Sequence, residues 1–325
     1  MEVEFVRAQR PLVCILGGTG FVGHHLVNHL VENGYRVRVA SRRPVRHRDL
    51  AVLPHVELLG ADVHNPQDLA GLLTGCSAVV NLVAILNEER TGDFQRVHVG
   101  LPRKIIQACQ EQGVTRLLHM SALNADPRGD LSRYLTSKGE GEALIHSVDG
   151  LEVTSFRPSV IFGLGDHFFN RFAALLRSAP LLFPLACPRS RFAPVHVDDV
   201  VGAMLKTLAD RHTIGQRYDL CGPHAYTLQQ LVEFTARTIG VRRVILPLGD
   251  GLSRLQARIM QHLPGRPFTY DNYLSLQVDS VCRQGFPAIF GIDPQLIESI
   301  VPIYLANRTL RGRYHQFRAL ARHEY

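Results

Sequence analysis

The sequence predicts an α/β fold: a doubly wound parallel sheet with a smaller C-terminal lobe. Two observations support this prediction. In the first half of the chain, short apolar runs alternate with segments whose apolar residues recur at helical spacing, and a glycine-rich turn joins the first such pair. The chain has 325 residues, of which 46% are hydrophobic and 20% charged, so it can bury a large core and still build a second lobe.

The first half of the chain alternates strand and helix in order. Strands are expected at Leu12–Leu16, Tyr35–Ala40, Val56–Leu59, Ala78–Val83, Arg116–Met120 and Val153–Arg157. Helices are expected from the glycine-rich turn to Asn33 and at Asp68–Leu73, Phe94–Gln112 and Ser132–His146. Because such alternation requires right-handed crossovers, the strands should form a Rossmann sheet with helices on both faces and a ligand crevice at its carboxyl edge.

The second half is less regular and predicts a small lobe. Helices are expected at Thr227–Ile239, with Thr227 as N-cap, at Leu252–Leu263, and from Val200 onward with Asp198 and Asp199 as caps. We expect 1–165 to form the Rossmann domain, with 190–222 returning to it, 166–189 and 223–307 to form the lobe, and 308–325 to be a basic tail. The apolar segment Pro180–Leu185 fits lobe core, a pocket for an apolar or isoprenoid substrate, or a docking site.

The glycine-rich turn predicts a dinucleotide site. Gly17 and Gly20 lack a Cβ that would hold the backbone away from a pyrophosphate, and Gly23 lets the helix approach the strand, so that the helix N-terminus faces the phosphates. The predicted cofactor contacts in this turn are Gly17, Gly18, Thr19, Gly20, Phe21, Val22 and Gly23.

The end of the second strand favours NADP(H) over NAD(H). Ser41, Arg42 and Arg43 stand where an NAD site places an acid, and guanidinium groups bind a 2′-phosphate well. A solvated basic loop is the alternative for this segment; it explains Arg46 and Arg48 well and Arg42 less well. Further contacts are predicted at the carboxyl ends of other strands, at Asp62, Val63, Leu82, Val83, Ala84, Pro158 and Val160. Asp62 fits either the adenine amino group or a helix cap before Pro66.

Tyr134 and Lys138 form a second motif, which predicts a catalytic site. Four residues apart on a helix they share a face, so the ammonium can lower the pKa of the tyrosine and let it exchange a proton with a carbinol or carbonyl oxygen. Lys138 can also hold the nicotinamide ribose. A solvated helix face is the alternative, which the position after the fifth strand disfavours.

These motifs resemble those of extended and atypical short-chain dehydrogenases/reductases. Gly17 to Gly23, the Tyr134/Lys138 pair, Arg157-Pro158-Ser159 and His196-Val197-Asp198-Asp199 follow the family's order. Ser121 to Ala125, Tyr134 to Glu142 and Phe162 to Phe172 are most similar to the nucleotide-binding accessory subunit of respiratory complex I and its stand-alone bacterial relatives. That resemblance implies bound NADPH and association with a membrane-bound complex or with quinone metabolism.

The resemblance also reveals a departure. Active family members carry a catalytic Ser or Thr at the end of the fifth strand, and here Ala122 follows Ser121 at that point. If Ala122 holds the catalytic position, the loss of one oxyanion donor lowers turnover by about 10²-fold. If the match to the family pattern is shifted by one residue, Ser121 holds the catalytic position and is the oxyanion donor. Arg157 and Asp166 lie where relatives meet substrate; for Arg157, pairing with a nearby acid is the alternative.

Composition limits the partners, metals and cellular location to be expected for this chain. The net charge is +7, yet no basic stripe is interleaved with stacking aromatics, so we expect no nucleic-acid partner. Six scattered cysteines predict reduced core thiols, and the histidines lack acidic or cysteine partners at ligand spacing, so no metal is expected. No signal peptide or membrane span is apparent, which predicts a cytoplasmic protein, with peripheral attachment to the inner membrane through the arginine-rich tail as the alternative.

Two function classes therefore remain. The first is an accessory, assembly or quinone-metabolism-linked protein that holds NADP(H), which we favour because of Ala122 and the resemblance. The alternative is an active NADP-dependent oxidoreductase of the reductase, dehydrogenase or epimerase type that uses Tyr134 and Lys138.

Overall fold

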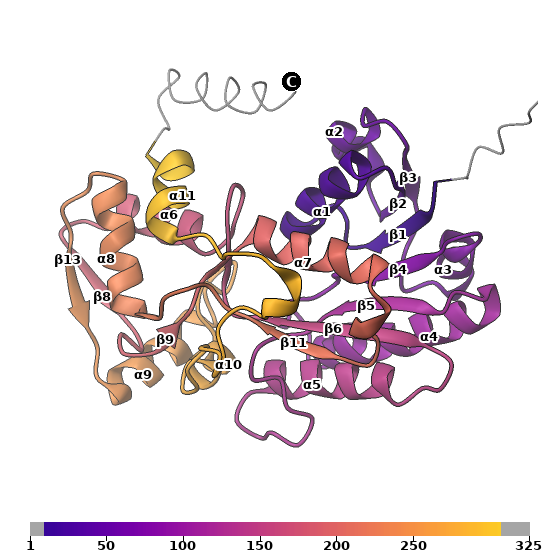
Figure 1. The fold of residues 1–325 in the computed structure, drawn as a ribbon. Helices are drawn as coiled ribbons and strands as arrows, with labels where there is room; N and C mark the ends of the chain where they lie inside the picture. The colour runs from indigo at the N-terminus through magenta and orange to yellow at the C-terminus, as the bar shows by residue number, and fades with distance from the viewer. Residues whose placement is uncertain (1–9, 307–325) are drawn as a thin grey trace, which may run out of the picture.

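The central sheet is the predicted parallel one (Figure 1). A computed structural model of the protein describes residues 10–306, so the N-terminal residues and the predicted tail at 308–325 lie outside the described residues. Seven parallel strands lie in the order β11-β6-β5-β4-β1-β2-β3, and the strand order reverses between β1 and β4, where a Rossmann sheet places its ligand crevice. Their bounds are β1 Leu12–Leu16, β2 Arg36–Ser41, β3 Val56–Gly60, β4 Ala78–Asn81, β5 Arg116–Met120, β6 Glu152–Pro158 and β11 Arg217–Leu220.

Helices cover both faces of the sheet. One face carries α1 Phe21–Glu32, α2 Arg48–Ala51 and α7 Val197–Ala209, and the other carries α3 Pro66–Leu73, α4 Leu101–Gln112 and α5 Arg133–His146. Each face has its own core, built from alternate residues of the same strands: Val13 and Ile15 face one core, Cys14 and Leu16 the other. The sheet that carries the predicted dinucleotide turn is therefore packed on both faces.

The small lobe lies beside the sheet. It contains α6 Phe169–Ser178, α8 Leu228–Thr238, α9 Asp250–Met260, α10 Tyr270–Ser275 and α11 Ile297–Leu305. Three two-stranded sheets complete it, pairing β7 Ile161–Phe162 with β10 Val195–His196, β9 Arg191–Phe192 with β12 Tyr226–Thr227, and β8 Leu182–Leu185 with β13 Val244–Pro247. The sequence does not predict these short strands, because two- to four-residue elements carry too little periodicity.

Helix caps were predicted with mixed success. Thr227 caps α8 through a capping box with Gln230, as expected. The caps assigned to Asp198 and Asp199 are wrong: both lie in the first turn of α7, and their carboxylates are engaged by distant residues instead. Asp198 Oδ1 lies 2.9 Å from His25 Nδ1 on α1, and Asp199 accepts a 2.8 Å hydrogen bond from the Gln295 N–H.

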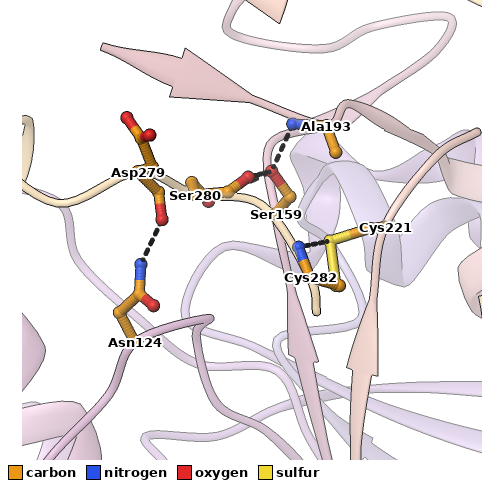
Figure 2. Close-up of a disulfide and its surroundings, with 7 residues drawn as sticks. All are labelled: Asn124, Ser159, Ala193, Cys221, Asp279, Ser280 and Cys282. Carbon is orange, nitrogen blue, oxygen red and sulfur yellow. Dashed lines mark hydrogen bonds between the residues drawn. A yellow bond between two sulfur atoms is a disulfide. The ribbon is translucent and has the colours of Figure 1, made fainter. Parts of the chain in front are cut away.

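The expectation of six reduced thiols is wrong for one pair. Cys221, directly after β11, forms a disulfide with Cys282, while Cys14, Cys76, Cys109 and Cys187 are buried and free (Figure 2). The two cysteines are separated by 61 residues, so only the tertiary fold brings them together. Hydrogen bonds surround the bridge, including Ser159 Oγ to Ser280 O at 2.7 Å.

Candidate functional site

The glycine turn is shaped for close backbone packing. Gly17 has a φ angle of +87°, a backbone conformation that residues other than glycine rarely adopt. A Cβ at Gly23 would lie 2.4 Å from Gly17 O. Gly20 is the N-cap of α1 and has no side chain to bond the first N–H groups of the helix. These donors and the positive end of the helix dipole are therefore available to an anion, as a pyrophosphate site requires.

The turn lies against the end of β4. A Cβ at Gly17 would be 3.1 Å from the carbonyl carbon of Leu82 and 3.2 Å from Val83 N. The structure places the other predicted contacts along the same carboxyl edge: Ser41 at the end of β2, Asp62 and Val63 after β3, Ala84 after β4, and Pro158 and Val160 at and after β6. The predicted cofactor residues thus share one edge of one sheet.

The basic segment after β2 begins with two exposed arginines. Ser41 Oγ is buried and accepts a 3.1 Å hydrogen bond from the Arg43 N–H, so this hydroxyl stabilises the turn. Arg42 and Arg43 are exposed, and within residues 10–306 no ion pair involves them. They remain free to bind an anion at the end of β2.

Asp62 is exposed after β3, and the alternative that it caps a helix is wrong. Asn65 caps α3 by accepting from the N–H groups of Gln67 and Asp68. Asp62 Oδ1 instead accepts a 3.0 Å hydrogen bond from the His64 N–H.

Tyr134 and Lys138 lie in α5, as predicted. Lys138 is buried, donates a 2.6 Å hydrogen bond to Met120 O, and has its pKa lowered to about 8 by burial. The expected lowering of the Tyr134 pKa is not found: burial and the negative charge of Asp271 raise it to about 12. In this arrangement the phenol is a proton donor rather than a base at neutral pH.

The end of β5 carries an unsatisfied hydroxyl. Ser121 is 4% exposed, and its Oγ has no hydrogen-bond partner among residues 10–306, whereas its backbone N–H donates to Phe156 O at 2.8 Å. Leaving such a group unpaired costs about 1–3 kcal/mol, so the position suits a polar ligand atom. Ala122, the next residue, offers no side-chain donor.

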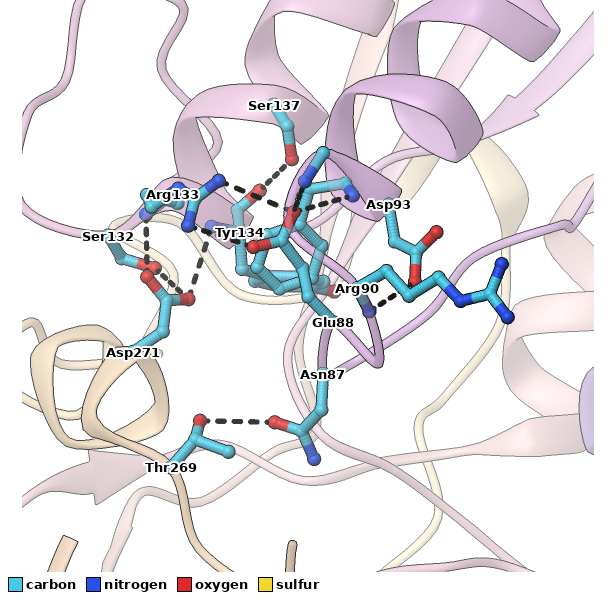
Figure 3. A network of polar contacts seen from close by, with 12 residues as sticks. Asn87, Glu88, Arg90, Asp93, Ser132, Arg133, Tyr134, Ser137, Thr269 and Asp271 are labelled. Atoms are coloured by element: carbon cyan, nitrogen blue, oxygen red, sulfur yellow. Dashed lines mark hydrogen bonds and ion pairs between the residues drawn. The ribbon is translucent and has the colours of Figure 1, made fainter. Parts of the chain in front are cut away.

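Asp271, which the sequence analysis missed, ties the lobe to α5 (Figure 3). From α10 its carboxylate accepts hydrogen bonds from the N–H groups of Arg133 at 2.7 Å and Tyr134 at 3.1 Å, and from Ser132 Oγ at 3.0 Å. No local pattern could reveal it, because it lies more than a hundred residues from the helix that it caps.

Glu88 completes the same network from the loop after β4. It pairs with Arg133 at 2.9 Å and accepts from the N–H groups of Gly92 and Phe94, both at 3.0 Å (Figure 3). Thr269 Oγ1 of the lobe donates to Asn87 Oδ1 at 3.1 Å. The loop after β4, the start of α5 and the lobe thus form one hydrogen-bonded unit around Tyr134.

A π-helical turn, Gln95–Gly100, precedes α4 where a continuous helix was predicted, and it positions His98. His98 Nε2 accepts from the Ile85 N–H at 3.2 Å, so its Nδ1 donates to Ser137 Oγ at 2.9 Å. Burial and the charge of Lys138 lower the pKa of His98 to about 3, which keeps the ring neutral. With Phe94, this ring packs edge-on against the Tyr134 ring.

Two other sequence candidates have structural roles. Arg157 pairs with Glu142, with a closest distance of 2.6 Å, as its alternative interpretation proposed. Asp166 is buried, accepts from Tyr304 Oη at 2.5 Å, and caps α6 through the N–H groups of Phe169 and Asn170.

Folding brings carboxylates next to histidines that have no acidic partner at ligand spacing in the sequence. His24 pairs with Asp49 at 2.7 Å, and ligand atoms of His24, His47 and Asp49 lie within 4.8 Å of one another. Asp49 is 62% exposed. The sequence could not show this group because His24 lies on α1, whereas His47 and Asp49 lie at the start of α2.

The strand order and the glycine turn define the class: a Rossmann-fold protein of the dinucleotide-binding type. The chain belongs to the NAD dependent epimerase/dehydratase family, whose model matches residues 13–221. No helix within residues 10–306 is long and apolar enough to span a bilayer.

Curated relatives refine this assignment. The chain is 33% identical over 310 residues to NADH dehydrogenase [ubiquinone] 1 alpha subcomplex subunit 9, mitochondrial, of Mus musculus, covering 91% of this chain and 80% of that protein. It is 31% identical over 199 residues to a ceramide reductase of Caulobacter vibrioides, covering 60% of each chain. The resemblance to the complex I subunit family is therefore confirmed.

Solved structures confirm the fold. The gox2253 structure has a TM-score of 0.70 at 20% identity, covering 90% of this chain and 96% of its own. MoeE5 in complex with UDP-glucuronic acid and NAD has a TM-score of 0.63 at 23% identity, covering 73% of this chain and 85% of its own.

Proposed function

We propose that the chain binds NADP(H) and acts mainly as an accessory or assembly protein associated with a respiratory NADH dehydrogenase or with quinone metabolism at the inner membrane. The observation that carries the proposal is the glycine turn beside a β2 end that offers Arg42 and Arg43 in place of an acid. The mouse relative, a subunit of an NADH dehydrogenase, supports the accessory role over nearly the whole chain.

The residues around the predicted nicotinamide end favour holding the nucleotide over fast turnover. Ala122, at the end of β5, supplies no side-chain donor, and the raised pKa of Tyr134 disfavours the phenolate. Lys138, a buried ammonium, and Ser121, a buried hydroxyl without a partner among residues 10–306, suit the ribose and amide groups of a bound nucleotide.

An active NADP-dependent oxidoreductase is the second candidate. Tyr134 and Lys138 are both present, and Ser121 can serve as the second donor at the same edge. Bound NADPH would supply a hydride, and Tyr134 would give the proton from its phenol oxygen to the substrate oxygen. The similarity to a bacterial ceramide reductase supports this candidate over a shorter stretch.

The nucleotide released by denaturing the purified protein tests NADP(H) binding, and oxidation of bound NADPH by added acceptors separates the two candidates. We expect NADPH or NADP⁺, identified by mass spectrometry, and a stable 340 nm absorbance when short-chain quinones or aldehydes are added to the loaded protein. Release of NAD(H), or of no nucleotide, contradicts NADP(H) binding. Repeated oxidation of added NADPH by one of these acceptors establishes the enzyme instead.

A further inference from the structure

The end of the lobe remote from the sheet, where α9 and the β8–β13 sheet lie (Figure 1), exposes large apolar side chains. On α9, Leu252, Leu255 and Ile259 are 58%, 51% and 58% exposed, and their spacing places them in one stripe along the helix. The buried residues of the same helix are small, Ser253 and Ala257. The helix therefore turns its small residues inward and its large apolar residues outward, the reverse of an ordinary surface helix.

The neighbouring β8–β13 sheet also turns large apolar side chains toward solvent. Leu182 pairs with Val244, and Pro184 pairs with Leu246 in parallel register, so these four side chains share a face, and all are exposed. The opposite face, with Phe183, Leu185 and Ile245, packs on the lobe core. A two-stranded sheet with one face in water is expected to be polar outside, whereas this one is apolar on both faces.

These two elements adjoin, and we call their outward residues the lobe-end surface. Gln256 Nε2 of α9 donates to Pro184 O of β8 at 3.3 Å, which holds the helix against the strand. The lobe-end surface consists of Leu182, Pro184, Val244, Leu246, Leu252, Leu255 and Ile259.

The charges of the surrounding segments are mostly positive. Residues 167–197 contain four arginines and no acid, and residues 228–275, which run from α8 to α10, contain six arginines and three acids, of which only Asp250 lies on α9. That acid accepts a 2.6 Å hydrogen bond from Tyr273 Oη. Arg254 and Arg258 lie over the Tyr270 ring at 5.7 and 5.5 Å, which fixes two guanidinium groups on α9 itself.

We propose that the lobe-end surface docks on a bilayer that contains anionic phospholipid. Leucine and isoleucine side chains enter the headgroup boundary while arginines stay with the phosphates, the usual chemistry of an interfacial helix. An acidic protein would satisfy the arginines but would leave the apolar stripe in water. The proposal places membrane attachment in the lobe rather than in the arginine-rich tail, and it does not depend on dinucleotide binding.

Co-sedimentation of the full chain with vesicles tests the proposal. We expect binding to phosphatidylcholine vesicles containing phosphatidylglycerol at low salt, and at least tenfold weaker binding to pure phosphatidylcholine or in high salt. The variant Leu252→Ser/Leu255→Ser/Ile259→Ser should bind at least tenfold more weakly. Arg242→Gln should weaken binding about fivefold, as expected for one charge at an anionic surface.

Matched controls lie on the sheet domain. Val45→Ser/Val52→Ser/Leu86→Ser removes three residues that are 70%, 79% and 60% exposed, and Arg103→Gln removes an exposed charge on α4; both variants should bind like the parent chain. Thermal unfolding shows whether each variant folds. Because α9 residues are replaced at the surface only, the unfolding temperature should stay within a few degrees.

Four results would overturn the proposal. The first is that the full chain fails to bind anionic vesicles at low salt, and the second is that the triple α9 variant binds as well as the parent. The third is that truncation after Ala306 abolishes binding while the α9 variant retains it, which assigns attachment to the tail. The fourth is that the α9 variant dissociates a dimer without any change in vesicle binding, which shows that the surface mediates only dimerisation.

Discussion

Asp271 of the small lobe accepts a hydrogen bond from the backbone N–H of Tyr134, at 3.1 Å. The same carboxylate caps the helix that carries the candidate catalytic pair and raises the pKa of the tyrosine. Position and protonation of Tyr134 therefore depend on a residue of another lobe.

The first prediction follows from this contact. Asp271→Ala should lower the free energy of unfolding by about 1–2 kcal/mol because a helix cap is lost, and should lower the pKa of Tyr134 because a negative charge is removed. Urea unfolding measures the first effect, and an NMR titration of labelled tyrosine, assigned with Tyr134→Phe, measures the second. Asp149→Ala, an exposed carboxylate just after the same helix, is the control. An unchanged Tyr134 titration would contradict the electrostatic coupling.

The second prediction concerns nucleotide choice. We expect NADP(H) to bind at least about tenfold more tightly than NAD(H), and Arg42→Ala to remove most of this preference, since a charged contact is worth about 1.5 kcal/mol or more. Titration calorimetry with both nucleotides measures the ratio, and Arg46→Ala, in the basic loop, should leave it nearly unchanged. A ratio near one in the parent chain would refute the assignment.

The third prediction separates holding a nucleotide from using it. Tyr134→Phe should leave NADPH affinity within a few-fold and be silent in cells, whereas Gly20→Val should abolish both binding and function, because a side chain blocks the pyrophosphate. Complementation of a deletion strain, with nucleotide content measured in parallel, decides. A Tyr134→Phe protein that is stable and loaded but fails to complement would establish the enzymatic role.

The fourth prediction tests the packing of α5 against the π-helical turn. A Cβ at Gly141 would lie 1.9 Å from His98 O, so Gly141→Ala should destabilise the protein by about 3 kcal/mol. Gly71→Ala on α3, where the added carbon meets nothing within 4 Å, should instead stabilise by about 0.5–1 kcal/mol. Denaturant unfolding of both variants gives the comparison; equal effects would exclude close packing at Gly141.

The fifth prediction concerns pH. Asp198 Oδ1 lies 3.6 Å from His29 Nε2 and raises the pKa of His29, and although burial opposes it, His25 and His29 hold the pKa of Asp198 well below its usual value. The stabilisation from His29 is therefore complete below about pH 6.5, the ordinary histidine pKa, and is lost as pH rises through its raised value. Asp198→Asn should cost roughly 1 kcal/mol more at pH 5.5 than at pH 8.5.

Thermal unfolding at the two pH values checks this dependence. Asp49→Asn, which removes the partner of His24 but lies in a more exposed pair, should show a smaller difference. If the loss of unfolding free energy caused by Asp198→Asn were larger at pH 8.5 than at pH 5.5, the result would contradict the pairing of Asp198 with protonated His29.

The sequence predicts what is encoded locally. The glycine turn, the Tyr134/Lys138 spacing and the buried strands each rest on a few consecutive residues, and the six predicted strands of the sheet were found. What it could not predict depends on residues that meet only after folding: Asp271 capping α5, Asp198 bonded to α1, and Cys221 joined to Cys282. The raised pKa of Tyr134 has the same origin, because the responsible charge comes from the lobe.

The Cys221–Cys282 bond makes the segment between them a closed ring that begins and ends at one point beside β11. That ring contains α8, β13, α9 and α10, and so most of the lobe-end surface together with the cap of α5. A protease cut inside it would leave the two fragments covalently joined until a reductant released them. Most of the lobe-end surface is thus anchored at both ends to the sheet whose carboxyl edge carries the glycine turn.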